Sequence, residues 1–303
     1  MAIAEKTIKR GEIIIKEGDI GKSFFQLIEG RAGVYADYDK KEPFRLAILE
    51  AGEFFGEMAI LEAYPRSATV VAESNCQVIE IPESEMDKFF GENPDTVIQL
   101  MKHLGNRVQA MANDYTEAEQ LLKEMRESDA GKNKSLFSKI KKHMNMYQSN
   151  KNKITAPSAE SLRETFEKIK GQETGEMKTF SKGMIIFKEG KIDNRMYILH
   201  EGTVGMYNNY RSREEEKLAE IQAISFFGEM GIISEEEPRS VSAVAEAGGA
   251  TVEIVNPEDL ETMARKCPVK AAMILRHLSY KLRRLNIEFI GACKEITETY
   301  NKK

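Results

Sequence analysis

The sequence predicts an α+β protein made of two β-barrel domains of the double-stranded β-helix (jelly-roll) type, each followed by a long C-terminal helix. Three observations predict this fold: the chain repeats itself once, each copy begins with short β-type segments, and each copy ends with an apolar stripe at helical spacing. With 303 residues, of which 41% are hydrophobic and 31% charged, the chain has the composition of a globular protein of about two domains.

Internal repetition is the strongest of these signals. Segments of the first copy recur in the second at an offset of 172 residues: IIIKEGD (13–19) as IIFKEGK (185–191), FFQLIEGRAGVY (24–35) as MYILHEGTVGMY (196–207), and LAILEAGEFFGEM (46–58) as LAEIQAISFFGEM (218–230). The offset grows to 173 at Pro-Arg-Ser and to 174 in the region that follows. A unit of this size is a duplicated globular domain and not a solenoid repeat. We therefore predict a first domain over residues 1–127, a linker over 128–158 and a second domain over 159–303.

The first hundred or so residues of each copy are rich in β-branched and aromatic residues, and Gly-Asp, Glu-Gly and Glu-Ser-Asn turns divide them. In the first copy the predicted strands fall within IIIKEGD (13–19), FFQLIEGRAGVYA (24–36), FRLAIL (44–49) and SATVVAESNCQVIEI (67–81). Short strands at this spacing predict a barrel or jelly roll.

The apolar spacing changes after Pro94 and after Pro268, where residues recur at alternating intervals of four and three. These stripes run from Val97 to Met125 and from Ala271 to Ile296, about four heptads each, and predict a long helix with a coiled-coil seam. Each stripe either covers its own β-domain or packs on another helix, and both hold if the first turns serve the domain and the later turns a partner. That partner is the other helix of the chain or a second copy of the chain.

The predicted linker, residues 128–158, carries seven Lys and one Asp, a net charge of +6. Leu136, Ile140, Met144 and Tyr147 share one face at helical spacing, which indicates a short amphipathic helix within it. A basic segment of this kind is either a solvated tether or a contact for phosphate groups, and nothing in it supplies base-reading specificity.

Composition and cysteine usage limit the classes of function and partner that we expect for this protein. The net charge of -5 gives no chain-wide attraction to nucleic acid or anionic lipid. No apolar run approaches the roughly 18 residues that span a bilayer, and the N-terminus lacks a signal peptide, so we expect a cytoplasmic protein without a membrane partner. Cys76, Cys267 and Cys293 have the spacing of free thiols. We expect no enzyme, no metal site and no cofactor, because four scattered histidines build neither a catalytic nor a metal-binding cluster.

The residues that carry chemistry form a motif that occurs twice, Phe-Gly-Glu-Met followed by Pro-Arg-Ser. Gly lets the backbone approach a ligand, and a short helix that begins at the Glu directs free N–H groups outward. The Arg supplies a planar fork that matches two phosphate oxygens. The Glu suits such a site only if it accepts hydrogen bonds from a hydroxyl such as a ribose 2′-OH. The motif thus predicts a site for a compact phosphate fused to a sugar, built from Gly56, Glu57, Arg66 and Ser67 in the first copy and Gly228, Glu229, Arg239 and Ser240 in the second.

This run, Phe-Gly-Glu-Met-Ala-x-Leu with Pro-Arg-Ser-Ala-Thr, resembles the phosphate-binding cassette of the cyclic nucleotide-binding domain family, found in the catabolite activator protein and in regulatory subunits of cyclic AMP-dependent protein kinase. The resemblance covers almost the whole chain, twice. It implies that Glu57 and Glu229 hold the ribose 2′-OH and that Arg66 and Arg239 hold the cyclic phosphate. It also implies backbone contacts from Gly56, Met58, Gly228 and Met230, and hydrogen bonds to phosphate or base from Ser67 and Ser240. The long helices are similar to the family's C-helix, which closes over the base.

Two departures from the family pattern bear on the ligand. Met111-Ala112 and Leu285-Asn286 stand where hydroxyls would meet the adenine amino group, so the ligand is cyclic AMP (cAMP) or, as an alternative, cyclic GMP (cGMP). The second copy has Glu235-Glu236-Glu237 where the first has Glu62-Ala63-Tyr64, and the added carboxylates predict weaker anion binding in the second copy.

From these observations we expect a regulatory sensor with two cyclic nucleotide sites that signals to another protein by rearranging its C-helices. Only a few residues follow the second helix, which leaves no room for a helix-turn-helix, and no kinase-docking segment precedes the first strand. Two alternatives stay open. A ligand-free structural dimerisation or interaction protein would show no ligand response, and a nucleic-acid-linked regulator acting through the basic linker would bind in a salt-dependent way.

Overall fold

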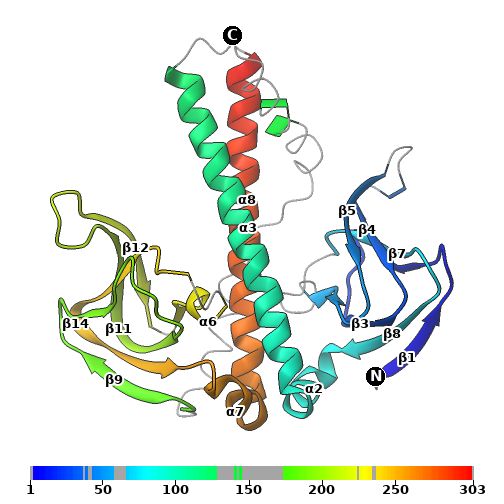
Figure 1. Cartoon of the computed structure of the whole chain (residues 1–303), viewed down its shortest axis with the longest axis horizontal. Helices are drawn as coiled ribbons and strands as arrows, with labels where there is room; N and C mark the ends of the chain where they lie inside the picture. Colours follow the sequence, from blue (N-terminus) through cyan, green and yellow to red (C-terminus); the bar gives the residue numbers. More distant parts are fainter. Residues whose placement is uncertain are drawn as a thin grey trace.

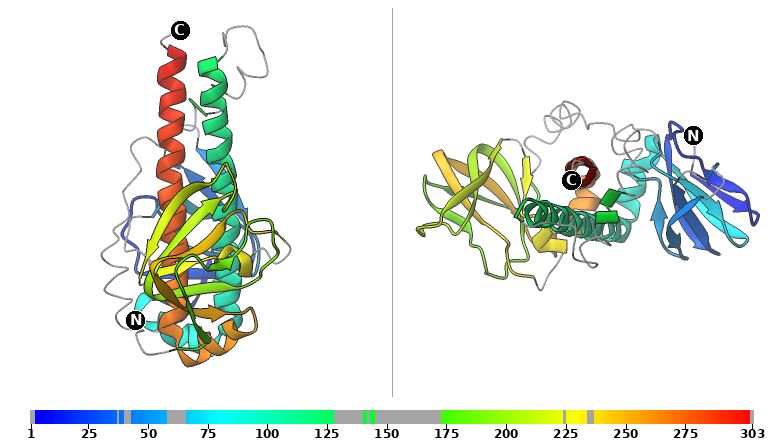
Figure 2. Two further views of the ribbon diagram at one scale, coloured as in Figure 1. Left: turned by 90° about the vertical axis from the view of Figure 1, so that its left-hand side faces the viewer. Right: turned by 90° about the horizontal axis from the view of Figure 1, so that it is seen from above.

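The computed structural model describes residues 3–36, 38–39, 43–57, 66–127, 140–141, 143–144, 173–223, 225–233 and 237–301. Two β-domains lie on opposite sides of a pair of long helices (Figures 1 and 2). The fold is therefore α+β, with two jelly-roll-like sheet domains that are each followed by helices. This agrees with the predicted jelly-roll type, in which the strands form open sheets and not a closed barrel.

The first domain contains two four-stranded antiparallel sheets. One has the order β1-β8-β3-β6, from Ala4–Ile8, Cys76–Pro82, Ser23–Glu29 and Phe54–Phe55. The other has the order β2-β7-β4-β5, from Ile13–Ile15, Thr69–Ala72, Ala32–Ala36 and Phe44–Leu49. The predicted β-type segment 24–36 contains β3 and β4, which are separated at the predicted Glu-Gly turn, where Gly30 has a φ of 91° that suits glycine. Side chains from both sheets, among them Leu27 and Val70, fill one core.

The second domain contains one six-stranded antiparallel sheet with the order β10-β14-β11-β12, in which β13 pairs with β11 and β9 with β14. Its two long strands, β11 (Met196–Asn208) and β14 (Ser242–Val255), each correspond to two strands of the first domain. Register shifts in their pairing bend these strands without ending them. The shorter strands are β9 (Glu176–Phe180), β10 (Ile185–Phe187), β12 (Glu216–Gln222) and β13 (Ser225–Phe227).

The two long helices, α3 (Pro94–Glu127) and α8 (Pro268–Asn301), have 34 residues each. Both begin at a proline, whose fixed φ and missing N–H suit the first helical position. The shorter helices are η1 (Glu83–Glu85), α2 (Met86–Glu92), α6 (Met230–Ile233) and α7 (Asp259–Lys266).

The apolar stripes of α3 and α8 serve both expected roles, at different heights along the helices. In the first turns, Leu100 of α3 and Leu275 of α8 share a core with Phe24 of β3. In the later turns, Leu122 of α3 packs in one cluster with Phe289 of α8. The two helices of one chain therefore pair with each other, side by side in both views of Figure 2. A heptad supercoil and a homodimer remain predictions.

Part of the predicted linker packs against this helix pair. Ile140 is buried in the cluster of the later turns, and Met144 packs on that cluster. The His143 ring meets the Phe289 ring edge-on, with 5.9 Å between the ring centroids. The expected partners on the same face, Leu136 and Tyr147, lie outside the described residues.

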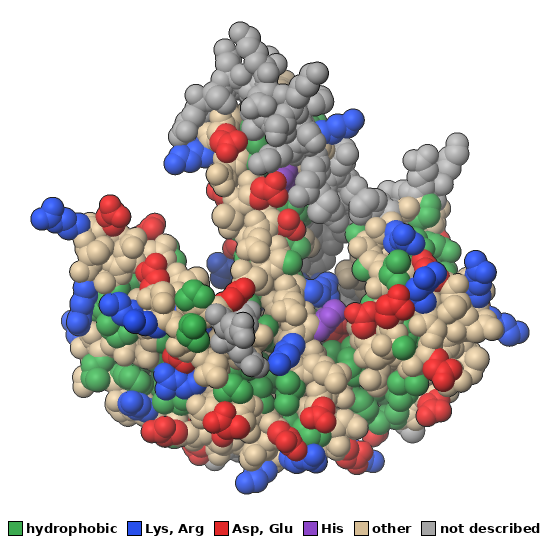
Figure 3. All heavy atoms as spheres, in the orientation of Figure 1, with side chains coloured by type: hydrophobic (Ala, Val, Ile, Leu, Met, Phe, Trp, Pro, Cys, Tyr) green, Lys and Arg blue, Asp and Glu red, His purple; other side chains and the backbone are tan. Residues whose placement is uncertain are grey.

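The surface and the cysteines agree with the composition. Acidic and basic side chains are interspersed over both β-domains on the face drawn in Figure 3. Within the described ranges, no helix is long and apolar enough to cross a membrane. Cys76, Cys267 and Cys293 are buried, and no disulfide joins them, as their spacing predicts.

Candidate functional site

The first copy folds the two parts of its motif onto each other. The Arg66 guanidinium donates from Nη1 to the Gly56 carbonyl at 2.5 Å and from Nη2 to the Ser23 carbonyl. Gly56 has a φ of 77°, and a Cβ there would lie 2.6 Å from Arg66 Nη1, so this turn needs glycine. Burial lowers the pKa of Arg66, and the nearby Glu57 carboxylate opposes that shift. The result is a nearly buried guanidinium that stays charged at neutral pH.

The second copy repeats this arrangement of an arginine held by two backbone carbonyls. Arg239 donates from Nη1 to the Gly228 carbonyl at 2.6 Å and from Nη2 to the Arg195 carbonyl. Its guanidinium also stands over the Phe187 ring, 4.3 Å from the ring centroid. Burial lowers the pKa of Arg239, and the neighbouring Asp193 carboxylate is the largest opposing influence. Both copies thus hold their arginine on two backbone carbonyls at equivalent positions.

Each motif glutamate is ion-paired with a basic residue of the long helix that follows its domain. Arg107 Nη1 of α3 lies 3.1 Å from Glu57 Oε1, and Lys281 Nζ of α8 lies 2.5 Å from Glu229 Oε1. Both glutamates are only 4% exposed. Burial by itself raises the pKa of Glu229, but Lys281 outweighs it and the pKa lies at about 2. Neither Arg107 nor Lys281 was predicted from the sequence, although they occupy equivalent positions of the repeat, which is a signal that could have identified them.

The cassette of the second domain also touches the helix of the first domain. Ile233 of α6 packs against α3 at Gly105, where a Cβ would lie 2.3 Å from Ile233 Cδ1. Only a residue without a side chain lets α6 approach α3 this closely. Helix α3 therefore contacts both cassettes, through Arg107 in the first and Gly105 in the second.

The remaining predicted site residues have different outcomes. Ser67 and Ser240 are exposed, each next to its arginine, and Met230 begins α6. Two predictions concern positions outside the described residues. One is the role of Met58. The other is the weaker anion binding of the second copy, which compares Glu62-Ala63-Tyr64 with a segment that contains Glu235 and Glu236. Within the part of the chain that the structure describes, no group of three or more His, Cys, Asp or Glu side chains is placed to hold a metal ion.

A buried ionic network at the start of α8 was not predicted. Lys270 Nζ lies 2.9 Å from both carboxylate oxygens of Glu253 on β14, and neither side chain is exposed. His200 Nε2 lies 3.0 Å from Glu253 Oε2, and the backbone N–H groups of Thr174 and Gly175 donate to Oε1 at 2.8 and 2.9 Å. This network joins β11, β14 and α8 in the second domain. The equivalent of Lys270 in the first copy is a threonine, Thr96.

Comparison with known proteins agrees with this architecture of two sheet domains, each with a glycine turn, a buried glutamate and a buried arginine under a long helix. The model of the cyclic nucleotide-binding domain family matches residues 5–93 and 177–267. The chain therefore belongs to this family and carries two such domains in tandem.

Among its relatives, a cAMP-dependent protein kinase regulatory subunit of Blastocladiella emersonii is 21% identical over 238 residues, which are 78% of this chain and 47% of that protein. A cGMP-dependent protein kinase of Plasmodium berghei (strain Anka) is 40% identical over 67 residues, 22% of this chain and 7% of that protein. The solved regulatory domain of Toxoplasma gondii PKA with cAMP is 20% identical, covering 89% of this chain and 85% of that chain with a TM-score of 0.28. The chain thus spans less than half the length of these two curated relatives.

Proposed function

We propose that this protein is a regulatory sensor with two cyclic nucleotide sites, one in each predicted domain (1–127 and 159–303), that reports ligand binding to a partner protein. One observation carries the proposal: each half holds a nearly buried arginine and a nearly buried glutamate of the same motif in the same arrangement. Buried charges cost folding free energy, so their retention in both copies supports a binding role. We propose no catalytic residue and no cofactor, because the role of the site is to bind.

The roles follow from the chemistry of each group. Arg66 and Arg239 bind the cyclic phosphate through charge-assisted hydrogen bonds. Glu57 and Glu229 accept a hydrogen bond from the ribose 2′-OH. The backbone of Gly56, Met58, Gly228 and Met230 and the hydroxyls of Ser67 and Ser240 complete the two sites. For the base we place cAMP ahead of cGMP, because the relative that spans 78% of this chain is named a cAMP-dependent regulatory subunit.

The ion pairs at the two glutamates support signalling through the helices. Arg107 on α3 and Lys281 on α8 occupy the same carboxylates that the ribose would approach. A ligand that binds a carboxylate therefore acts on a group that also holds the helix, so ligand position and helix position are linked. The contact of α6 with α3 at Gly105 gives the second site a further link to the helix pair.

Titration calorimetry of the whole chain tests the binding function, with cAMP, cGMP and linear AMP as ligands. We expect two molecules of cyclic nucleotide per chain and no heat from linear AMP. Loss of a charge-assisted hydrogen bond from a buried arginine costs roughly 1.5–3 kcal/mol, so Arg66→Ala and Arg239→Ala should each weaken one site by about ten- to a hundredfold or more.

The matched control variants are Arg45→Ala and Arg265→Ala, which remove a half-exposed guanidinium from each half and should leave both affinities unchanged. Absence of cyclic nucleotide binding in the parent protein, or equal affinities in the arginine variants and the parent, would refute the proposed function.

Amide hydrogen exchange tests the signalling step. In the parent protein, saturating cyclic nucleotide should change protection along α3 and α8. In the double variant Arg107→Met, Lys281→Met, binding should persist while this change shrinks, because the link between carboxylate and helix is gone. An unaltered change in protection in that variant would contradict helix signalling through these ion pairs.

A further inference from the structure

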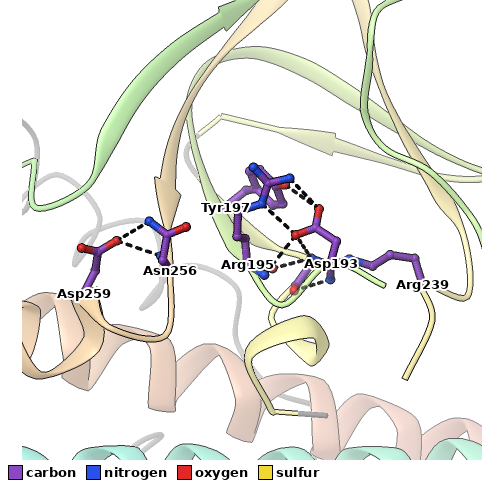
Figure 4. A network of polar contacts seen from close by, with 7 residues as sticks. Asp193, Arg195, Tyr197, Arg239, Asn256 and Asp259 are labelled. Atoms are coloured by element: carbon purple, nitrogen blue, oxygen red, sulfur yellow. Dashed lines mark hydrogen bonds and ion pairs between the residues drawn. The ribbon is translucent and has the colours of Figure 1, made fainter. Parts of the chain in front are cut away.

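Arg239, the arginine proposed to bind phosphate in the second copy, has an acidic neighbour within a polar cluster, shown in Figure 4. Asp193 Oδ1 lies 3.6 Å from Arg239 Nη2. Arg195 holds the same carboxylate with two side-chain bonds, from Nε to Oδ1 at 2.8 Å and from Nη2 to Oδ2 at 3.1 Å. The Tyr197 hydroxyl donates to Oδ2 at 2.9 Å. The carboxylate is thus fixed by two residues beside a third, Arg239.

The first copy has the equivalent of Arg239, Arg66, but lacks the residues around it in this cluster. Its residues at the positions of Asp193, Arg195 and Tyr197 are Gly21, Ser23 and Phe25. A Cβ at Gly21 would lie 2.1 Å from Arg66 Cζ, so no aspartate fits beside the guanidinium as it is placed there. Both arginines use equivalent backbone carbonyls, but the acidic groups around them differ. Asp193 lies beside Arg239, whereas the charges of Glu80 and Asp19 act on Arg66.

The carboxylate is charged and close to the cation. Burial by itself raises the pKa of Asp193, but the hydrogen bonds from Arg195 and Tyr197 and the charge of Arg239 outweigh it, so Asp193 is ionised at neutral pH. Its side chain is 9% exposed and that of Arg239 is 5% exposed, so water screens this pair weakly. An incoming phosphate must share Arg239 with a negative charge that is already in place. One donor of the arginine, Nε, is buried and has no hydrogen-bond partner among the described residues, so it remains for a ligand.

On the basis of the proposed function, we propose that Asp193 competes with the ligand phosphate for Arg239 and makes the second site bind cyclic nucleotide more weakly than it would without this carboxylate. Arg195 and Tyr197 are positioning residues that hold the Asp193 carboxylate in place. Arg195 neutralises part of the Asp193 charge and fixes both carboxylate oxygens through hydrogen bonds. It therefore limits how strongly the carboxylate pairs with Arg239. Removal of the carboxylate charge and removal of Arg195 should therefore change affinity in opposite directions.

The experiment measures cAMP binding to the second site alone, by calorimetry on the full chain carrying Arg66→Ala. In this background Asp193→Asn, which keeps the shape of the side chain and removes its charge, should tighten binding by about three- to tenfold. Arg195→Met should weaken binding by a similar factor. The double variant Asp193→Asn, Arg195→Met should behave like Asp193→Asn, because Arg195 acts through the carboxylate.

Lys191→Met is the matched control, since it removes an exposed positive charge from the same loop and should leave the affinity within about twofold. Thermal unfolding without ligand shows that each variant is folded. Weaker or unchanged binding in Asp193→Asn, or independent effects of the two substitutions, would overturn the proposal while the sensor function stands. No cAMP binding in the parent protein would refute the sensor function, and this inference with it.

Discussion

Replacement of Lys270 by methionine is expected to destabilise the second domain strongly. Methionine fits the length of the lysine stem but leaves the Glu253 carboxylate buried without its counter-charge. Removal of one partner of a buried ion pair costs roughly 3–5 kcal/mol. The lower end applies here, because His200 and two backbone N–H groups still bond the carboxylate. For a domain of about this size, roughly 3 kcal/mol corresponds to a fall in melting temperature of roughly 10 °C.

Calorimetry and urea unfolding followed by circular dichroism measure this loss on the full chain. The matched control is Lys266→Met on α7, an exposed lysine one turn away whose loss should change the free energy of unfolding by less than about 0.5 kcal/mol. A second substitution, Glu253→Gln, in the Lys270→Met protein should recover part of the stability, because it removes the buried charge. A loss below about 1 kcal/mol in Lys270→Met, or no recovery in the double variant, would refute the reasoning.

The same pair determines a pH dependence. Burial by itself raises the pKa of Glu253, but the hydrogen bonds from His200 and Lys270 outweigh it and hold this pKa at about 2. The ordinary value is 4.5, so the ionised carboxylate contributes stability above that pH and loses it as the pH falls from 4.5 toward 2. In Lys270→Met the folded-state pKa rises, and the acid loss of stability from this group shrinks. An identical acid profile of the two proteins would contradict the assignment of this shift to Lys270.

Three further predictions concern the helices. Gly105→Ala should lower the free energy of unfolding by about 1–2 kcal/mol in urea unfolding, because the added methyl group meets Ile233. The control Gly291→Ala on α8 has open space around it, so it should raise the free energy of unfolding by up to about 1 kcal/mol. Equal effects of the two substitutions would contradict the contact at Gly105. Burial lowers the pKa of His277, so stability should fall as the pH drops below 6.5, and His277→Phe should flatten this fall between about pH 7.5 and 5.5; parallel curves would exclude His277 as its cause. Ile140→Ala should remove about 2 kcal/mol of packing and speed tryptic cleavage of the linker, and an unchanged cleavage rate would count against its docking on the helix pair.

Several features of the fold could be predicted because they depend on local sequence. Pro94 and Pro268 mark the starts of α3 and α8, since proline suits the first helical turn. The apolar spacing after them predicted both the length of the helices and the division of their contacts between β-domain and partner helix. The Glu-Gly turn at Gly30 could be predicted as well, because glycine adopts the positive φ that the backbone needs between β3 and β4.

In the candidate site, too, some residues could be predicted from the sequence and some contacts could not. Repetition of the Gly-Glu and Arg motif identified the residues that meet in each copy, because the two parts of the motif lie only 10 positions apart and the Arg66 guanidinium donates to the Gly56 carbonyl. The ion pairs of the glutamates with Arg107 and Lys281 join residues about 50 positions apart, and a helical stripe does not say which of its polar residues faces the site. Asp193 was missed for a related reason, since it belongs to a loop outside the motif.

By itself, the sequence determined that this protein has two copies of one domain, a long helix after each, and the same Gly-Glu and Arg-Ser motif in both. These are properties of periodicity, of turn chemistry and of residue type. Only the tertiary structure decided that α3 and α8 pair within one chain, that α3 contacts both cassettes, and that an aspartate stands beside one arginine and a glycine beside the other. The physical reason is that such contacts depend on the packing of distant segments at ångström separations, where the presence of a single Cβ at Gly21 or Gly105 decides which groups can meet.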